Sequence, residues 1–80
     1  MTMLPTIRAE VLVFKTNLRL KKDLKRISAN ISQEPRIKLW HVDTADTDKV
    51  LRIEAVDITA FDIIQMIEQA GYQCQELPDN

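Results

Sequence analysis

The chain changes from a strand pattern to a helix pattern within EVLVFKTNLRL, residues Glu10–Leu20. The first half of this stretch is a continuous β-branched and aromatic run, typical of a central strand with apolar surroundings on both faces. Thr16 and Asn17 come next, and their side-chain oxygens suit the free amides at the start of a helix. The stretch therefore predicts a strand over 9–15 that turns directly into a helix.

An apolar repeat with helical spacing follows the turn. Its members, at spacings of 4, 3 and 4, are Leu20, Leu24, Ile27 and Ile31. This period predicts a helix whose buried face begins at Leu20 and whose pattern ends before Pro35. The opposite side is mostly charged, with Lys21, Lys22, Asp23, Lys25 and Arg26.

Two alternating segments predict a β-hairpin. Residues 36–43 alternate between two sets, one with Lys38, Trp40 and Val42 and the other with Ile37, Leu39 and His41. Residues 49–55 carry Leu51, Ile53 and Ala55 in phase. The polar residues 44–48 between these segments are typical of a hairpin connection, so we expect two antiparallel strands.

The C-terminal part predicts a second helix and a short last strand. Thr59 followed by Asp62 is a variant of the capping box, and Gly71 suits the left-handed position beyond a helix. Between them one side of the helix is apolar, with Ala60, Ile63, Ile64, Ile67 and Ala70. Residues 72–77 have a strand pattern, and residues 78–80 are expected to be a tail.

The order βαββαβ predicts an α+β, ferredoxin-like sandwich. Right-handed crossovers place both helices on one face of a four-stranded antiparallel sheet in the order 4-1-3-2. A chain of 80 residues suits one domain, 1–80, with an ordered core at about 9–77.

Composition narrows the classes of function. The chain is 45% apolar and 29% charged, as in ordinary globular domains. Its single cysteine excludes an intramolecular disulfide and favours a cytoplasmic protein. Met1–Arg8 lacks the apolar run of a signal segment, and no stretch approaches the roughly 20 residues that span a bilayer, so we expect no membrane contact. The chain has one histidine, one cysteine and no group of residues suited to acid–base catalysis. The sequence therefore predicts neither an enzyme nor a cofactor site.

Three segments resemble the heavy-metal-associated (HMA) domain family. They are Leu12–Leu20, Ile37–Ile53 and, most distinctively, Ile63-Ile64-x-x-Ile67-x-x-Ala70-Gly71-Tyr72. In that family a Thr-Cys-x-x-Cys run fills the turn before the first helix, and its two thiolates bind Cu(I) or Zn(II). The resemblance also likens Tyr72 to the family's aromatic residue beneath the metal loop.

The resemblance fails at the metal-ligand positions. Asn17 and Leu20 stand where the two cysteines would be. Soft ions need soft ligands, and neither an amide nor an aliphatic side chain replaces a thiolate. We therefore expect a degenerate member of the family that binds no metal at this turn.

The open face of the predicted sheet is the candidate interface for a protein partner or for self-association. If the first strand directs Leu12 and Phe14 towards the helices, an apolar group with two polar neighbours points away from them. Its residues are Val11, Val13, Leu39, His41, Val50 and Arg52. A bland alternative is that valine is simply common on open sheet faces. We expect a non-enzymatic protein-interaction or regulatory module.

Charge is divided unevenly along the chain. Residues 1–40 hold nine Lys and Arg against three acids, whereas residues 41–80 hold two against nine. The sequence is therefore a charge dipole. This division predicts pairing between the basic first helix of one molecule and the acidic second helix of another.

Other functions stay open beside this one. Cys74 of two chains, or Cys74 with a partner's ligands, is an alternative site for Cu or Zn, and a small anion at the Asn17 turn is another. Cys74 and His41 fall on opposite edge strands, so they cannot meet within one chain. Nucleic acid is not expected, because the strands lack stacking aromatics and Asp23 interrupts the basic patch.

Overall fold

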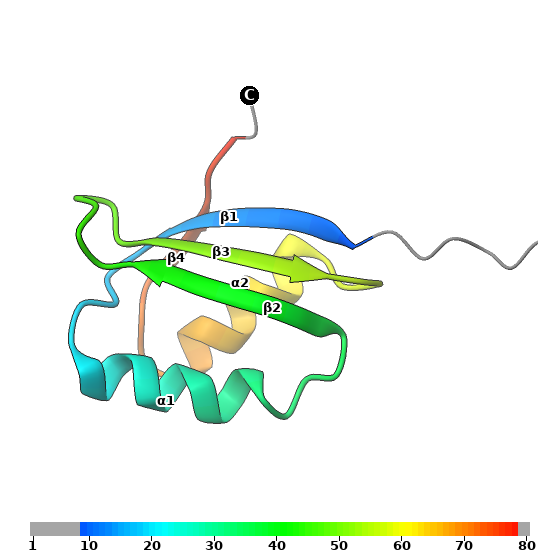
Figure 1. The fold of residues 1–80 in the computed structure, drawn as a ribbon, viewed down its shortest axis with the longest axis horizontal. Coiled ribbons are helices and arrows are strands. Elements are labelled where there is room, and N and C mark those ends of the chain that lie inside the picture. Colours follow the sequence, from blue (N-terminus) through cyan, green and yellow to red (C-terminus); the bar gives the residue numbers. More distant parts are fainter. Residues whose placement is uncertain (1–8, 79–80) are drawn as a thin grey trace, which may run out of the picture.

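The computed structural model describes residues 9–78, and the expectations for residues 1–8 and 79–80 lie outside this range. Its elements follow the order βαββαβ (Figure 1). They are β1 (Glu10–Thr16), α1 (Lys21–Ile31), β2 (Ile37–Asp43), β3 (Val50–Ala55), α2 (Ala60–Gln69) and β4 (Cys74–Glu76). Element order and type are as predicted, and β4 is shorter than expected.

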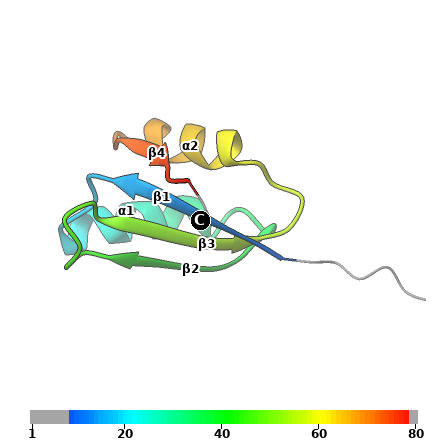
Figure 2. The same cartoon turned by 90° about the horizontal axis from the view of Figure 1, so that it is seen from above.

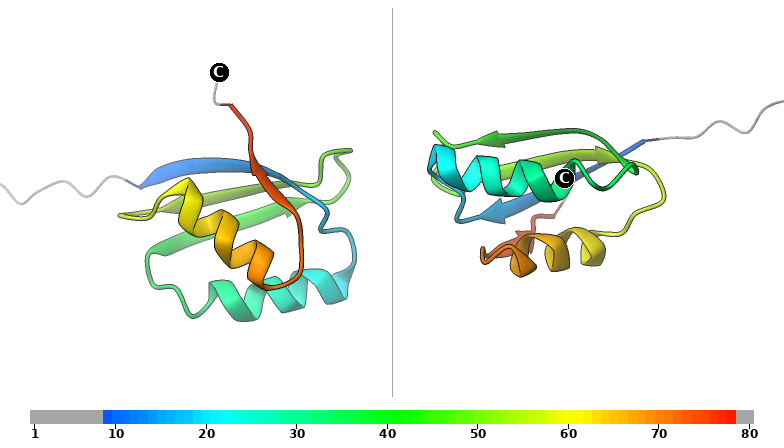
Figure 3. Two further views of the ribbon diagram at one scale, coloured as in Figure 1. Left: turned by 180° about the vertical axis from the view of Figure 1, so that it is seen from behind. Right: turned by 90° about the horizontal axis from the view of Figure 1, so that it is seen from below.

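The four strands form one antiparallel sheet in the order β2-β3-β1-β4. This is the predicted 4-1-3-2 arrangement with β3 and β1 in the centre. Both helices lie on the same side of the sheet, below the strands in Figure 1 and in front of them when the molecule is seen from below (Figure 3). From above, the other face of the sheet is turned towards the viewer (Figure 2). One face is thus covered and the other is open.

The core lies between the sheet and the two helices. Its fully buried large side chains are Phe14, Leu18, Ile27, Leu51, Ile53, Ile63 and Ile67. Strands β1 and β3 supply inward side chains at every second position, and each helix supplies two isoleucines about one turn apart, as their respective periods require. The rest of the chain is positioned against this layer.

The start of α1 differs from the prediction. The helix begins at Lys21, and Leu20 is its N-cap residue with 45% of its surface exposed. The buried residue of this turn is Leu18, which has no exposed surface. The prediction that Leu20 opens the buried stripe was therefore wrong, while Ile27 and Ile31 are buried as expected. The chain enters the core before it becomes helical, so helical spacing does not apply to the turn.

Strand β2 contains an irregularity that the alternation of its sequence did not reveal. Its register against β3 shifts between Ile37 and Leu39, so that Ile37 pairs with Ala55. A bulge of this kind adds one residue and reverses the side-chain alternation beyond it. Ile37 therefore packs against the core, and its assignment to the same face as Leu39 was wrong.

Both predicted ends of α2 are confirmed. The Thr59 hydroxyl accepts from the Asp62 amide at 3.2 Å, and the Asp62 carboxylate accepts from the Thr59 amide at 3.1 Å. Gly71 has a φ of 98°, and the following Tyr72 amide donates to the carbonyl of Ile67. This is a Schellman ending, in which a left-handed glycine lets the chain reverse. It directs Tyr72 back towards the start of α1.

Candidate functional site

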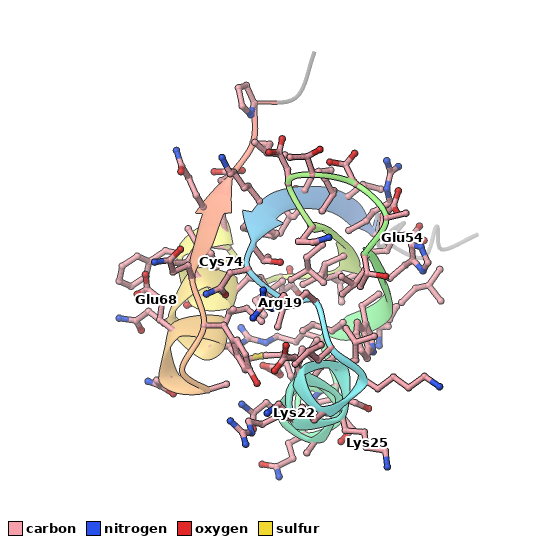
Figure 4. All side chains as sticks on the ribbon, turned by 90° about the vertical axis from the view of Figure 1, so that its left-hand side faces the viewer. Arg19, Lys22, Lys25, Glu54, Glu68 and Cys74 are labelled. Carbon is pink, nitrogen blue, oxygen red and sulfur yellow. The ribbon has the colours of Figure 1, made fainter. Side chains whose placement is uncertain are left out.

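The turn between β1 and α1 lies at one end of the molecule, which faces the viewer in Figure 4. Arg19 lies near the centre of that view, and Lys22 lies below it on the first turn of α1. A depression of about 610 Å³ is lined here by residues of the turn, of the β2–β3 connection and of the segment before β4. It includes Asn17 and Leu20, the two positions at which the resemblance locates metal ligands.

Thr16 fixes the beginning of this turn. Its hydroxyl donates to the carbonyl of Lys49 at 2.6 Å and accepts from the amide of Leu18 at 3.2 Å. The amide of Thr16 donates to the carbonyl of Asp48 at 3.0 Å. The turn is therefore bound to the β2–β3 connection, and Thr16 is buried instead of capping α1.

Asn17 fixes the other side of the turn. Its side-chain oxygen accepts from the amide of Gln73 at 2.9 Å and so joins the turn to the segment that enters β4. The prediction that Asn17 caps the helix was wrong, because its oxygen is directed across the molecule. A helical sequence pattern reflects only residues that are close in sequence. It could not predict this contact, because the contact spans more than fifty residues.

Asp23 provides the cap that the sequence assigned to Thr16 and Asn17. One carboxylate oxygen accepts from the amides of Leu20 at 3.0 Å and Arg19 at 3.3 Å, and the other accepts from the Tyr72 hydroxyl at 2.8 Å. The Leu20 amide, followed by Tyr72, holds the pKa of Asp23 below its ordinary value. Burial and the bond to Asp23 raise the pKa of Tyr72.

This network leaves little for a small anion to bind at the turn. An anion at a helix start needs free backbone amides, and the amides of Arg19 and Leu20 already donate to a carboxylate. The Asp23 carboxylate also repels a second negative charge. The anion hypothesis gains no support from this geometry.

The lone thiol lies on β4, next to the end of β1 that leads into the turn. Cys74 begins β4, opposite Thr16 on β1, and only 9% of its surface is exposed. Burial, with a smaller contribution from Glu68, raises the pKa of its thiol to about 12. His41 lies on β2 at the other edge of the sheet, as predicted. Within residues 9–78, no group of three or more His, Cys, Asp and Glu is arranged to hold a metal ion.

The candidate interface residues lie on the sheet face away from the helices. The exposed fraction is 47% for Val11 and 61% for Leu39, and Val13 and Val50 are half-buried. The face position follows from alternation with the inward-facing residues of each strand. That these residues form an interface stays a prediction.

Two charged residues separate the apolar members of this face. On the central strand β3, Glu54 lies between its register partners Leu39 of β2 and Val11 of β1. Arg52 lies in the same way between His41 and Val13. The apolar group predicted from sequence is therefore interleaved with charge. Glu54 was missed, although its position two residues beyond Arg52 puts it on the same face.

Leu77 is a further residue of this face that the sequence reasoning missed. Its amide donates to the carbonyl of Val13 at 2.9 Å, which places Leu77 beside Val13 just beyond β4. Alternation from the buried Cys74 turns the half-buried Leu77 to the open side. The apolar residues of the face are thus Val11, Val13 and Leu77 on the β1 side, Val50 at the start of β3, and Leu39 on β2.

No protein-family model matches this sequence, and no curated protein matches it. Solved structures with the same fold do. The N-terminal domain of PacS from Synechocystis PCC6803 has a TM-score of 0.73 at 18% identity, over 88% of this chain and 100% of that one. The N-terminal domain of ZntA in its apo form has a TM-score of 0.74 at 11% identity, over 88% and 94%.

A third similar structure is the apo HMA domain of a copper chaperone for superoxide dismutase. Its TM-score is 0.71 at 10% identity, over 98% of this chain and 79% of that chain. At such identities the likeness shows the fold. The predicted ferredoxin-like, HMA-like fold is confirmed, and this chain carries it with a single cysteine at position 74. Among the described residues, no helix is long and apolar enough to span a bilayer.

Proposed function

We propose that this chain is a non-enzymatic protein-interaction or regulatory module that keeps an HMA-like fold without its dithiolate metal site. The observation that carries the proposal is the use of the two ligand positions. Asn17 joins the turn to the segment before β4, and Leu20 is the N-cap residue of α1, with its amide donating to Asp23. These positions serve the fold, so function is assigned to a surface.

Protein docking is the property that we carry over from the similar structures. One of them is the HMA domain of a copper chaperone that serves another protein, superoxide dismutase. Copper is not carried over, because a soft ion needs the thiolates that positions 17 and 20 lack. The reducing cytoplasm suits a module whose lone thiol is buried.

The open sheet face is the working surface that we assign. On this face Val11 and Leu39 have large exposed fractions, and they lie beside the charged side chains of Arg52 and Glu54. Apolar side chains surrounded by polar groups are the composition of a docking surface of moderate affinity. The basic outer side of α1 is a second region for electrostatic contact with an acidic partner.

Metal binding through Cys74 is the weaker candidate function. The thiolate is the form that binds metal, and burial at the β4 edge raises the pKa of this thiol to about 12. A titration of the reduced protein with Cu(I) and Zn(II) tests it against the Cys74→Ser variant. If the unaltered chain binds metal and Cys74→Ser abolishes that binding, the result supports this candidate and contradicts the proposal that the chain is an interaction module.

Site-specific cross-linking tests the proposed surface. A photo-reactive amino acid replaces Leu39 on the open face or, as a matched control, Phe61 on α2, whose exposed fractions are 61% and 64%. In the source cell we expect protein adducts from position 39 and few from position 61. Adducts that arise equally from both positions, or from neither, contradict the assignment of the sheet face.

A further inference from the structure

We propose that the partner of the open sheet face is the same face of a second copy of this chain, set in register by reciprocal Arg52–Glu54 ion pairs. This inference rests on the proposed function, because it names the occupant of that surface. The inference adds the symmetry of the dimer and the residue pairs that meet across it.

The face is organised as two adjacent rows across the sheet. One row has Glu54 in the centre, with Leu39 on β2 and Val11 on β1. The next row has Arg52 in the centre and holds His41, Val13 and Leu77. Each row therefore places one charge on the central strand with an apolar residue on the β1 side. The two charges have opposite sign.

Consider a two-fold axis that runs parallel to the sheet, across the strands and midway between the two rows. This axis makes the pattern complementary to itself. It places Glu54 of one copy on Arg52 of the second copy, and the reverse pair forms by symmetry. The same operation brings Val11 onto Val13 of the second copy. Two sheets packed in this way lie about 10 Å apart with a strand angle of about 30°. Long Arg and Glu side chains suit that separation.

The two charges on the central strand of this face have no partner among the residues that the structure describes. Neither Arg52 nor Glu54 takes part in an ion pair or a side-chain hydrogen bond with any residue of 9–78, and the recorded ion pairs are Lys15–Asp48 and Arg36–Glu34. Arg52 and Glu54 lie on the same strand and face, yet they do not pair with each other. Arg52 is exposed and Glu54 is half-exposed. Their pairing capacity is thus available to a second molecule.

The charged helices are a poorer surface for an isologous contact. The outer side of α1 carries Lys21, Lys22, Lys25 and Arg26, while its one acid, Asp23, is buried. Two copies meeting through α1 would oppose like charges. A two-fold axis between the helices would pair α1 of each copy with α2 of the other. The acids of α2 are Asp62 and Glu68, and the Asp62 carboxylate already accepts from the amide of Thr59, so α2 offers little charge to match α1.

The area of this face predicts a weak dimer. Four strands at about 4.8 Å spacing offer less surface than the roughly 800 Å² per partner of a standard stable interface. We therefore expect a dissociation constant in the micromolar range or weaker. Sedimentation of the full chain from about 5 μM to about 1 mM covers this range, and raising the salt concentration should weaken the association.

Two single charge reversals test the reciprocal pairs. Arg52→Glu and Glu54→Arg each place like charges opposite one another twice in the two-fold arrangement. Each should raise the dissociation constant about a hundredfold. The matched control is Lys25→Glu, which reverses a charge on the exposed side of α1 and should leave the dissociation constant unchanged.

Rescue separates lost pairing from damaged folding. The double variant R52E/E54R restores opposite charges in every pair and should dimerise like the unaltered chain. An equimolar mixture of the two single variants should form a heterodimer, although each alone is monomeric. A change that merely disturbed the sheet would show neither form of rescue.

Several results would overturn the inference. They are a chain that stays monomeric up to about 1 mM, single variants that dimerise normally, or single variants that neither the double variant nor mixing restores. If the chain is monomeric and position 39 cross-links to a different protein, this inference fails while the proposed function stands. If position 39 yields no adduct either, both fail.

Discussion

Two leucines in one turn have opposite environments. Leu18 is fully buried, whereas Leu20 keeps 45% of its surface exposed. We expect Leu18→Ala to lower the free energy of unfolding by about 2–5 kcal/mol, because it leaves a cavity in the core. Leu20→Ala should change it by less than about 0.5 kcal/mol. Urea denaturation measures both, and equal losses would contradict the placement of the turn.

The carboxylate of Asp23 predicts a distinct response to acid. Its pKa is lowered in the folded chain by the Leu20 amide and by Tyr72, so the unfolded state binds protons first as the pH falls. The resulting stabilisation is complete above the unfolded pKa of about 4 and is lost as the pH falls through the lower folded value. Asp23→Asn should therefore lower the free energy of unfolding at pH 7 and weaken its dependence on pH below about 4.

Urea unfolding over the acid range checks this expectation. The control is Asp57→Asn, which removes an exposed carboxylate that makes no side-chain hydrogen bond within residues 9–78. Asp57 has a φ of 53°, a conformation that asparagine also tolerates. If Asp23→Asn keeps the acid profile of the unaltered chain, the Asp23 network does not stabilise the fold.

At the scale of elements, regular patterns were predictable and irregular connections were not. The alternation in β3 and the Thr59 cap of α2 are local signals, and both are confirmed. The bulge that turns Ile37 inward depends on how β2 meets β3, and the Asn17–Gln73 bond depends on tertiary packing. The open face was located correctly, but its interleaved charge needed the register between strands.

Strand β4 is a short edge element, and its thiol reports on its opening. Cys74 is buried against β1, and burial raises the pKa of its thiol to about 12. A thiol reagent at pH 8 should therefore modify it slowly, and faster as urea opens the strand. The control is the Cys74→Ser/Gln75→Cys variant, because position 75 is exposed. Equal rates for the two chains would show that Cys74 is accessible in the folded state.

At the scale of the whole molecule, the turn and the sheet face divide the roles of the chain. Hydrogen bonds of Thr16, Asn17 and Asp23 bind the turn to the β2–β3 connection, the entry to β4 and Tyr72. The open face has no such internal partners for Arg52 and Glu54 within the described residues. The turn at which the resemblance places a metal site is thus held by hydrogen bonds, and the face opposite the helices is the one to which we assign binding.

The central claim is that this HMA-like fold has a structural turn in place of a metal site. The measurement is competition of the reduced protein with a chromophoric Cu(I) chelator, beside the Asn17→Cys/Leu20→Cys variant. We predict that the unaltered chain leaves the chelator loaded and that the double variant withdraws Cu(I), because two thiolates at these positions supply the soft ligands. Withdrawal of one Cu(I) per molecule by the unaltered chain would contradict the account.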